Sequence, residues 1–109
     1  MKMLKATFLM IMLLFIIGCQ KTPGEMNELF IEARNEIHKG NYNKGIEMLE
    51  DLADDGHLLS QKTFAHIYAE GSIVKKDFDK AKYWLNKAAE QGDLEAKILY
   101  EKLDKENYQ

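Results

Sequence analysis

Apolar residues recur at helical spacing along most of the chain from Glu25 onward. One stripe of apolar and small residues runs from Tyr42 to Ala53, and a second runs from Phe78 to Ala89, each at the steps of an amphipathic helix. The sequence shows no sustained alternation and few β-branched residues, so no strand is predicted. The pattern predicts an all-α fold of five helices, over residues 26–39, 42–55, 58–70, 78–91 and 94–106.

The chain also repeats itself at an offset of 36 residues. The segment 41–45, Asn-Tyr-Asn-Lys-Gly, corresponds to 77–81, Asp-Phe-Asp-Lys-Ala. The same offset gives the pairs Leu49 and Leu85, Ala53 and Ala89, Gly56 and Gly92, and Leu58 and Leu94. A period of this length is typical of a helical solenoid, in which each helix pair buries its apolar face against the next.

The ends of the predicted helices carry residues suited to capping. Asn41 and Asp77 are expected N-caps, whose side-chain oxygens accept hydrogen bonds from free amides of the first turn. Gly56 and Gly92 fall where helices end and are expected to be left-handed. Because the connections are short except for residues 71–76, successive helices are expected to pack side by side and antiparallel.

A specific set of residues lies between positions 60 and 96. The set comprises Phe64, Ala65, Tyr68, Gly71, Val74, Lys76, Asp77, Ala81, Trp84, Lys87-Ala88-Ala89-Glu90-Gln91-Gly92 and Ala96. This pattern resembles the Sel1-like repeat, a relative of the tetratricopeptide repeat. Ser60 departs from it by replacing the usual alanine, and Ile73 replaces a frequent loop glycine, so the loop conformation is expected to differ because isoleucine does not adopt positive φ without strain.

The resemblance is weaker outside that segment. Residues 26–59 follow the general tetratricopeptide pattern through Ala33, Ile37, Gly40, Tyr42 and Gly45. Residues 94–106 look like the first helix of a third repeat, and their charged face suits a C-terminal cap. The resemblance implies a short α-solenoid of antiparallel helix pairs, with about two Sel1/TPR-like repeats and a capping helix.

The resemblance also implies where a partner protein would bind. In this repeat class the first helix of each pair lines the concave face. The candidate groove residues are therefore Phe30, Arg34, Thr63, His66, Ile67 and Glu70. Tyr83 is a further surface candidate, whereas Trp84 is expected to be a core position.

The N-terminal segment has the layout of a secretory signal peptide. Lys2 and Lys5 precede an uncharged apolar run from Ala6 to Ile17. That run is too short to cross a bilayer comfortably, which takes about 20 residues. Residues 1–18 are therefore predicted to be a signal peptide, and a helical membrane anchor is the weaker alternative.

Cys19, the single cysteine, ends the apolar run in the context Leu-Phe-Ile-Ile-Gly-Cys, residues 14–19. This segment resembles the lipobox of bacterial lipoproteins. The resemblance implies cleavage between Gly18 and Cys19, a diacylglycerol on the Cys19 thiol, a lipidated tether over 19–25 and a repeat domain over 26–109. For a diderm bacterium, Gln20 after the cysteine implies sorting to the outer membrane, with the protein facing the periplasm. The alternative is an ordinary signal peptide with a chance cysteine.

The charge balance excludes some partners. The chain has 15 basic and 18 acidic residues. Loss of residues 1–18 would remove Lys2 and Lys5, which leaves 13 basic residues and a net charge of −5. Nucleic acid is therefore not an expected partner.

Acids dominate the first two predicted helices, whereas lysines gather around the fourth: Lys75, Lys76, Lys80, Lys82 and Lys87. The alternatives are ordinary solvated faces or a charge asymmetry that orients a partner.

No catalytic or metal-ligating constellation is evident. The histidines are His38, His57 and His66, and the last two are nine residues apart rather than the three or four that share a helix face. We expect solvated or groove-lining imidazoles, no enzyme activity, no metal and no cofactor.

Three functions remain open at this stage. The first is a lipid-anchored module that scaffolds or regulates a protein at the cell envelope. The second is an immunity protein that neutralises a periplasm-acting toxin. The third is an accessory subunit of a cell-wall hydrolase.

Overall fold

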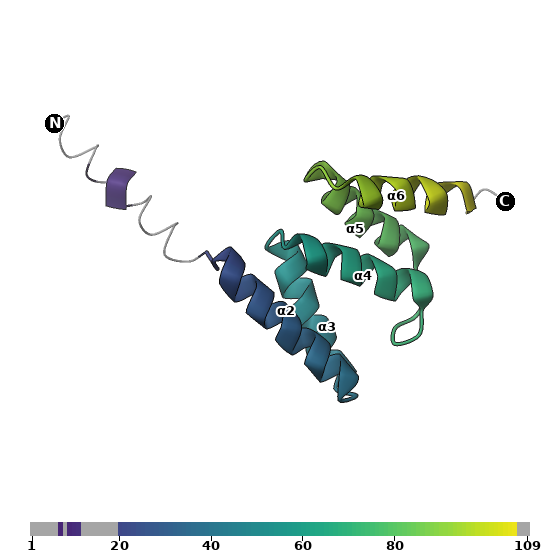
Figure 1. Ribbon diagram of the computed structural model, residues 1–109, viewed down its shortest axis with the longest axis horizontal. Helices are drawn as coiled ribbons and strands as arrows, with labels where there is room; N and C mark the ends of the chain where they lie inside the picture. The colour runs from purple at the N-terminus through teal and green to yellow at the C-terminus, as the bar shows by residue number, and fades with distance from the viewer. Residues whose placement is uncertain (1–6, 8, 12–19, 107–109) are drawn as a thin grey trace.

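A computed structural model describes residues 7, 9–11 and 20–106. The helices are α2 (Pro23–His38), α3 (Tyr42–Asp54), α4 (Leu58–Glu70), α5 (Phe78–Glu90) and α6 (Leu94–Glu106) (Figure 1). They confirm the five predicted helices, and these described stretches contain no strand. The predicted signal peptide, its cleavage site and Cys19 fall outside the described residues apart from residues 7 and 9–11. None of the helices described is both long and apolar enough to span a membrane.

The first helix begins earlier than the sequence pattern suggested, at Pro23 rather than at residue 26. Thr22 forms a capping box with Glu25: the Glu25 amide donates to the Thr22 hydroxyl at 3.2 Å, and the Thr22 amide donates to the Glu25 carboxylate at 2.7 Å. Proline is favourable at the first helical position because a backbone N–H there would have no acceptor within the helix, so its absence costs nothing. Residues 23–25, predicted to lie in the tether, are therefore the first turn of α2.

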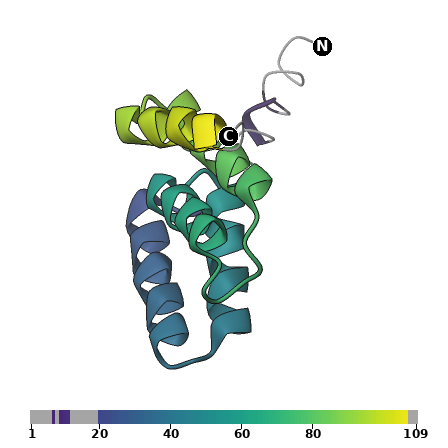
Figure 2. The ribbon, with the colours of Figure 1, turned by 90° about the vertical axis from the view of Figure 1, so that its right-hand side faces the viewer.

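The helix bounds repeat with the offset of the sequence. Moving α3 forward by 36 positions gives the bounds of α5, and moving α4 gives those of α6. Gly56 and Gly92 end the α3 and α5 turns with φ of +89° and +94°, which confirms their left-handed conformation. Successive helices pack in contact and run antiparallel. Figure 2 shows α2, α4 and α6 on one side of the molecule, with α3 and α5 on the other.

The two predicted N-caps have different outcomes. Asp77 caps α5, because its carboxylate accepts from the Lys80 amide at 3.0 Å. Asn41 stands at the N-cap position of α3, but its side chain makes no capping hydrogen bond. Its amide group donates instead to the Glu36 carboxylate at 2.9 Å. The prediction is wrong for Asn41 because a buried carboxylate on the preceding helix needs that donor.

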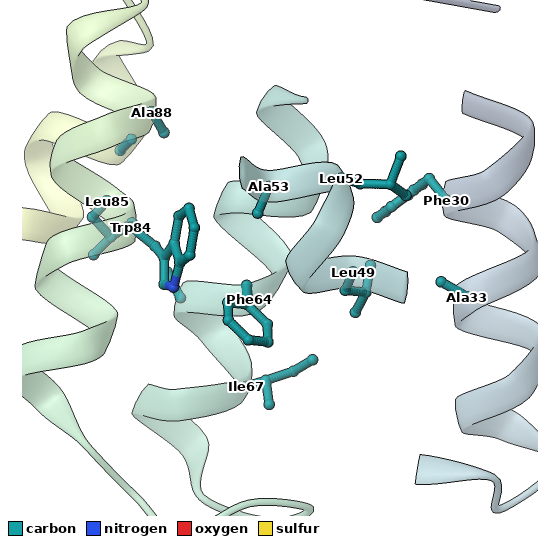
Figure 3. Packing of buried hydrophobic residues seen from close by; sticks show 12 residues of the cluster. Phe30, Ala33, Leu49, Leu52, Ala53, Phe64, Ile67, Trp84, Leu85 and Ala88 are labelled. Atoms are coloured by element: carbon teal, nitrogen blue, oxygen red, sulfur yellow. The ribbon is translucent and has the colours of Figure 1, made fainter. Parts of the chain in front are cut away.

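One apolar core runs through the helix stack (Figure 3). Trp84 confirms its predicted core position: it is 7% exposed, and its ring packs edge-on against Phe64 with centroids 5.5 Å apart. Leu49 and Leu52 of α3 are almost fully buried between α2 and α4. The core therefore couples each helix pair to the next, as a solenoid requires.

Candidate partner-binding groove

Two of the predicted groove residues lie in the core. Phe30 is 8% exposed and lies beside Leu52, and Ile67 is 7% exposed near Phe64 (Figure 3). The Phe30 side chain lies against Leu52 of α3 (Figure 3), and both Phe30 and Ile67 belong to the buried core cluster. The groove prediction is therefore wrong for these two residues, since burial leaves them little surface to offer a partner.

Three of the remaining predicted residues lie on α4, whereas Arg34 and Tyr83 lie on other helices. His66 and Glu70 are exposed on α4, with His66 Nε2 and Glu70 Oε2 3.6 Å apart. Thr63 is half-buried on the same helix. Arg34 is exposed on α2 with its guanidinium 5.8 Å from the centre of the Phe30 ring. Tyr83 is 54% exposed, as predicted, but it lies on α5 beside a separate cleft between α3 and α5.

His66 lies at the rim of a cleft formed by α4, α5 and α6, with a volume of about 160 Å³. We call this cleft the α4–α6 groove. Its apolar lining residues are Ala65, Leu85, Leu99 and Leu103, and its polar lining residues are Lys62, His66, Lys102 and Glu106. An apolar floor with a polar rim is the usual anatomy of a site that accepts a protein side chain.

The contribution of α6 to this groove was missed by the sequence analysis, which treated the helix as a charged cap. Leu99 is 40% exposed, and its neighbour Ile98 is 65% exposed. At the offset of 36, these residues correspond to Lys62 and Thr63 of α4, which are polar. The sequence therefore did contain a sign of this apolar surface: two polar residues of α4 are replaced by apolar residues at the equivalent positions of α6.

The outer face of α6 does behave as a cap. At the offset of 36, Lys97 and Glu101 correspond to the buried Gln61 and Ala65 of α4. Charged residues thus stand where a further repeat would pack. Leu94, which is 74% exposed, adds an apolar residue one turn before Ile98. The apolar surface of α6 therefore extends from the groove onto the exposed side of the helix.

Ion pairs fix one wall of the groove. The Lys62 ammonium bridges to the Asp93 carboxylate at 3.4 Å and to the Glu95 carboxylate. The hydrogen bond to Glu95 raises the pKa of Lys62. The pKa of Asp93 is lowered, chiefly by the Ala96 amide that donates to it at 2.8 Å and also by Lys62. These charges tie the start of α6 to α4 and hold the groove walls at a fixed separation.

His57 is not a solvated or groove-lining residue. It is 8% exposed, with Nδ1 2.7 Å from the Ser60 hydroxyl and Nε2 2.9 Å from the Asn27 side-chain oxygen. Burial lowers the pKa of His57, so the ring is neutral at pH 7. Nε2–H then donates to Asn27 and the Ser60 hydroxyl donates to Nδ1. His57 is therefore structural, and Ser60 replaces the usual alanine because it serves this cluster.

Two further features of the described residues concern metal binding and buried polar groups. No group of three or more His, Cys, Asp or Glu side chains among them could hold a metal ion. The buried polar side chains within the described residues all have hydrogen-bond partners.

The helix stack and its groove define a short α-helical repeat protein. Residues 64–93 match the family model of the Sel1 repeat, so this part of the chain is similar to one Sel1 repeat. This match confirms the resemblance drawn from the sequence over residues 60–96. Sel1 repeats are in general non-catalytic modules for protein–protein interaction. No curated protein and no solved structure matched the chain.

Proposed function

We propose that this protein is a lipid-anchored envelope protein whose α4–α6 groove binds a segment of a partner protein. The observation that carries the proposal is the exposed apolar surface of Leu99 and Ile98 at positions where the equivalent helix has polar residues. Exposed apolar groups beside a polar-rimmed cleft favour an interface because their burial releases water. The partner segment is one that inserts an apolar side chain between α4 and α6.

Photo-crosslinking in the native cell tests the groove. A photoreactive residue in place of Ile98 is expected to trap a discrete partner, which is then purified and titrated with the full chain in detergent. Leu99→Glu places a charge on the groove floor and is expected to weaken binding at least tenfold. Tyr83→Glu is the matched control, because Tyr83 is also an exposed apolar residue but lies on α5. Equal binding by Leu99→Glu and the wild type would contradict the proposal.

The anchor is a separate part of the proposal, supported by the lipobox-like segment that ends at Cys19. A thiol is a nucleophile suited to alkylation, and two acyl chains or more hold a protein stably at a membrane. Mass spectrometry of the mature protein is expected to find an acylated Cys19 at the N-terminus. Cys19→Ser is expected to leave the membrane fraction; membrane retention of this variant without acylation would contradict the anchor.

The immunity function stays a second proposal, because α3 presents exposed acids such as Glu47, Glu50 and Asp54 that suit a basic toxin. Its distinguishing test is genetic. A toxin gene adjacent to this one, with protection of cells that depends on this protein, favours immunity over scaffolding. The absence of any effector gene nearby removes the reason for it.

A further inference from the structure

A second charged surface lies at the far end of α4, outside the groove. Lys75 and Lys76 in the loop before α5, together with Lys80 in its first turn, are exposed. Within residues 20–106 none of the three has a carboxylate at ion-pair distance, whereas Lys82 and Lys87 further along α5 are paired with Asp104 and Glu90. We call Lys75, Lys76 and Lys80 the basic loop surface. Asp77 and Asp79 are their sequence neighbours, but these carboxylates form no ion pair with the three lysines, whose ammonium groups stay open to a partner.

The backbone of this loop is braced at both of its ends. Gly71 ends α4 with φ of +70°, and a Cβ there would lie 2.6 Å from the Lys76 Cβ. The Asp77 amide closes the loop by donating to the Tyr68 carbonyl at 2.9 Å. No non-glycine residue in the described part has a positive φ. Ile73, expected to disturb the loop, instead packs half-buried against the core.

The lysine side chains are also positioned by aromatic rings. The Lys80 ammonium lies 5.0 Å from the centre of the Tyr68 ring, and that of Lys76 lies 5.5 Å from the centre of the Phe78 ring. Such contacts restrict long side chains without neutralising their charge. A fixed loop with restrained lysines loses less conformational entropy on binding than a mobile one.

The place of the loop limits what can bind it. Lys21 lies at the opposite end of α4, since its ammonium pairs with Asp55 at 2.8 Å near the α3–α4 turn. The 13 residues of α4 span about 20 Å between that turn and the loop (Figure 1). If the chain is anchored at Cys19 as proposed above, the basic loop surface lies at the end of α4 that is farther from the anchored segment. This separation favours a protein segment over a lipid headgroup of that membrane, and the vesicle comparison below tests the choice.

We propose that the basic loop surface docks an acidic segment of a partner protein, independently of the α4–α6 groove. Carboxylates spaced along a short segment can meet the three lysines, and long-range attraction raises the rate of encounter. A long polyanion such as nucleic acid would also meet the acidic helices of the chain and be repelled. This surface therefore selects a short acidic stretch.

A titration of the isotopically labelled full chain in neutral detergent tests the proposal, with a hexaglutamate peptide as the probe and NMR amide shifts as the readout. Shifts are expected to concentrate on residues 72–80. The double variant K75E/K76E is expected to weaken binding about tenfold. K97E/K105E is the matched control, with the same charge change on exposed α6 positions, and is expected to bind within twofold of the wild type. If K75E/K76E loses the circular dichroism spectrum of a helical protein, the charge-neutralising variant K75Q/K76Q is used in its place.

Several outcomes overturn the proposal. Equal losses in K75E/K76E and K97E/K105E, or shifts spread over all exposed lysines, would show unspecific attraction. Tighter binding to phosphatidylglycerol vesicles than to hexaglutamate, through the same lysines, would assign the surface to a membrane instead. Leu99→Glu is expected to leave hexaglutamate binding unchanged, so failure of the groove proposal and failure of this one are distinguishable.

Discussion

At the residue scale, His57 joins two helices that are distant in sequence. Its ring lies between Asn27 of α2 and Ser60 of α4, and its centroid is 5.4 Å from that of Phe30. Of the two neutral tautomers, the one with the proton on Nε2 satisfies both ring nitrogens, because the Asn27 side-chain oxygen accepts and the Ser60 hydroxyl can donate. Protonation would place a charge in a half-apolar site and would remove the acceptor that the Ser60 hydroxyl uses.

This gives the protein a pH-dependent stability. Because burial lowers the pKa of His57, the unfolded chain takes up the proton at a higher pH than the folded chain does. Stability is therefore expected to fall as the pH drops below about 6.5, the ordinary value for histidine. Urea unfolding of the full chain in detergent at pH 7.5 and at pH 5 measures the difference.

His38→Asn, which alters an exposed histidine, is expected to keep the same pH dependence. His57→Asn is expected to be less stable at pH 7.5 and to lose less stability on acidification. The carboxyls with a lowered pKa, Glu25, Glu36 and Asp93, lose their contribution only at lower pH and do not overlap this window. An unchanged slope in His57→Asn would show that other groups cause the dependence.

Sequence reasoning succeeded at residues whose role is local and failed at those whose role depends on distant partners. Gly56 and Asp77 act on the turn they occupy, so their position relative to the helix predicts them. His57 depends on Asn27, 30 residues away, and its equivalent at the offset of 36 is the capping residue Asp93. Periodicity alone therefore could not predict the burial of His57.

At the element scale, the spacing of α2 and α3 depends on Gly45. A Cβ at this position would lie 2.5 Å from the Ile37 Cγ1 and 2.7 Å from the Ala33 carbonyl oxygen. The equivalent position in α5 is Ala81, which is fully buried, so the α4–α5 pair accommodates the methyl group that α2–α3 excludes. The first helix pair is thus the closer-packed version of the same repeat.

Gly45→Ala is therefore expected to destabilise the protein by about 1–3 kcal/mol, in the range for overpacked cores. The usual gain from replacing a helical glycine by alanine, about 0.5–1 kcal/mol, would oppose part of this loss. Gly24→Ala is the control, because a Cβ there lies 4.0 Å from its nearest contact, the Thr22 hydroxyl. Chemical unfolding of the two variants should move in opposite directions; a stabilised Gly45→Ala would disprove the close approach.

Element bounds were predicted well where the repeat supplied two copies of a signal, and less well at the start of α2. The offset of 36 aligned α3 with α5 and α4 with α6. The first and last residues of these helices were therefore each indicated by two equivalent stretches of sequence. The start of α2 has no second copy. Its signal was Thr22 with Glu25 three residues later, which was overlooked because Pro23 and Gly24 suggested a linker.

At the scale of the whole molecule, α6 closes the stack. Ala96 is fully buried against the core, and Lys82 of α5 pairs with Asp104 at 2.9 Å. Removal of α6 would expose apolar surface of α5, including Leu85 in the groove floor. The groove itself would disappear with its second wall.

A chain ending at Gln91 is therefore expected to unfold at a lower temperature and less cooperatively than the full chain, since about three stacked units are needed in such arrays. Circular dichroism against temperature measures the loss. A chain ending at Glu106 removes only three residues and serves as the control. An unchanged midpoint without α6 would mean that α2–α5 form an independent stable unit.

The fold followed from periodicity because a solenoid is a sum of local contacts, each visible in a short stretch of sequence. The groove was predicted only in part, through His66, because it is made by side chains from three helices. Leu85 and Leu99 gain their role only when α5 and α6 pack beside α4. The apolar stripe of the fourth predicted helix indicated a core position for Leu85, and the sequence analysis gave Leu99 no role.

The identical bounds of the repeated helices have a consequence for how such a protein can grow. Each unit starts after a left-handed glycine and ends at the equivalent one, Gly56 and Gly92. A copy of residues 57–92 inserted after Gly92 would reproduce the native junction at both of its ends. The charged outer face of α6 would still terminate the array. The length of the binding surface is therefore a quantity that duplication can change while both ends of the molecule stay the same.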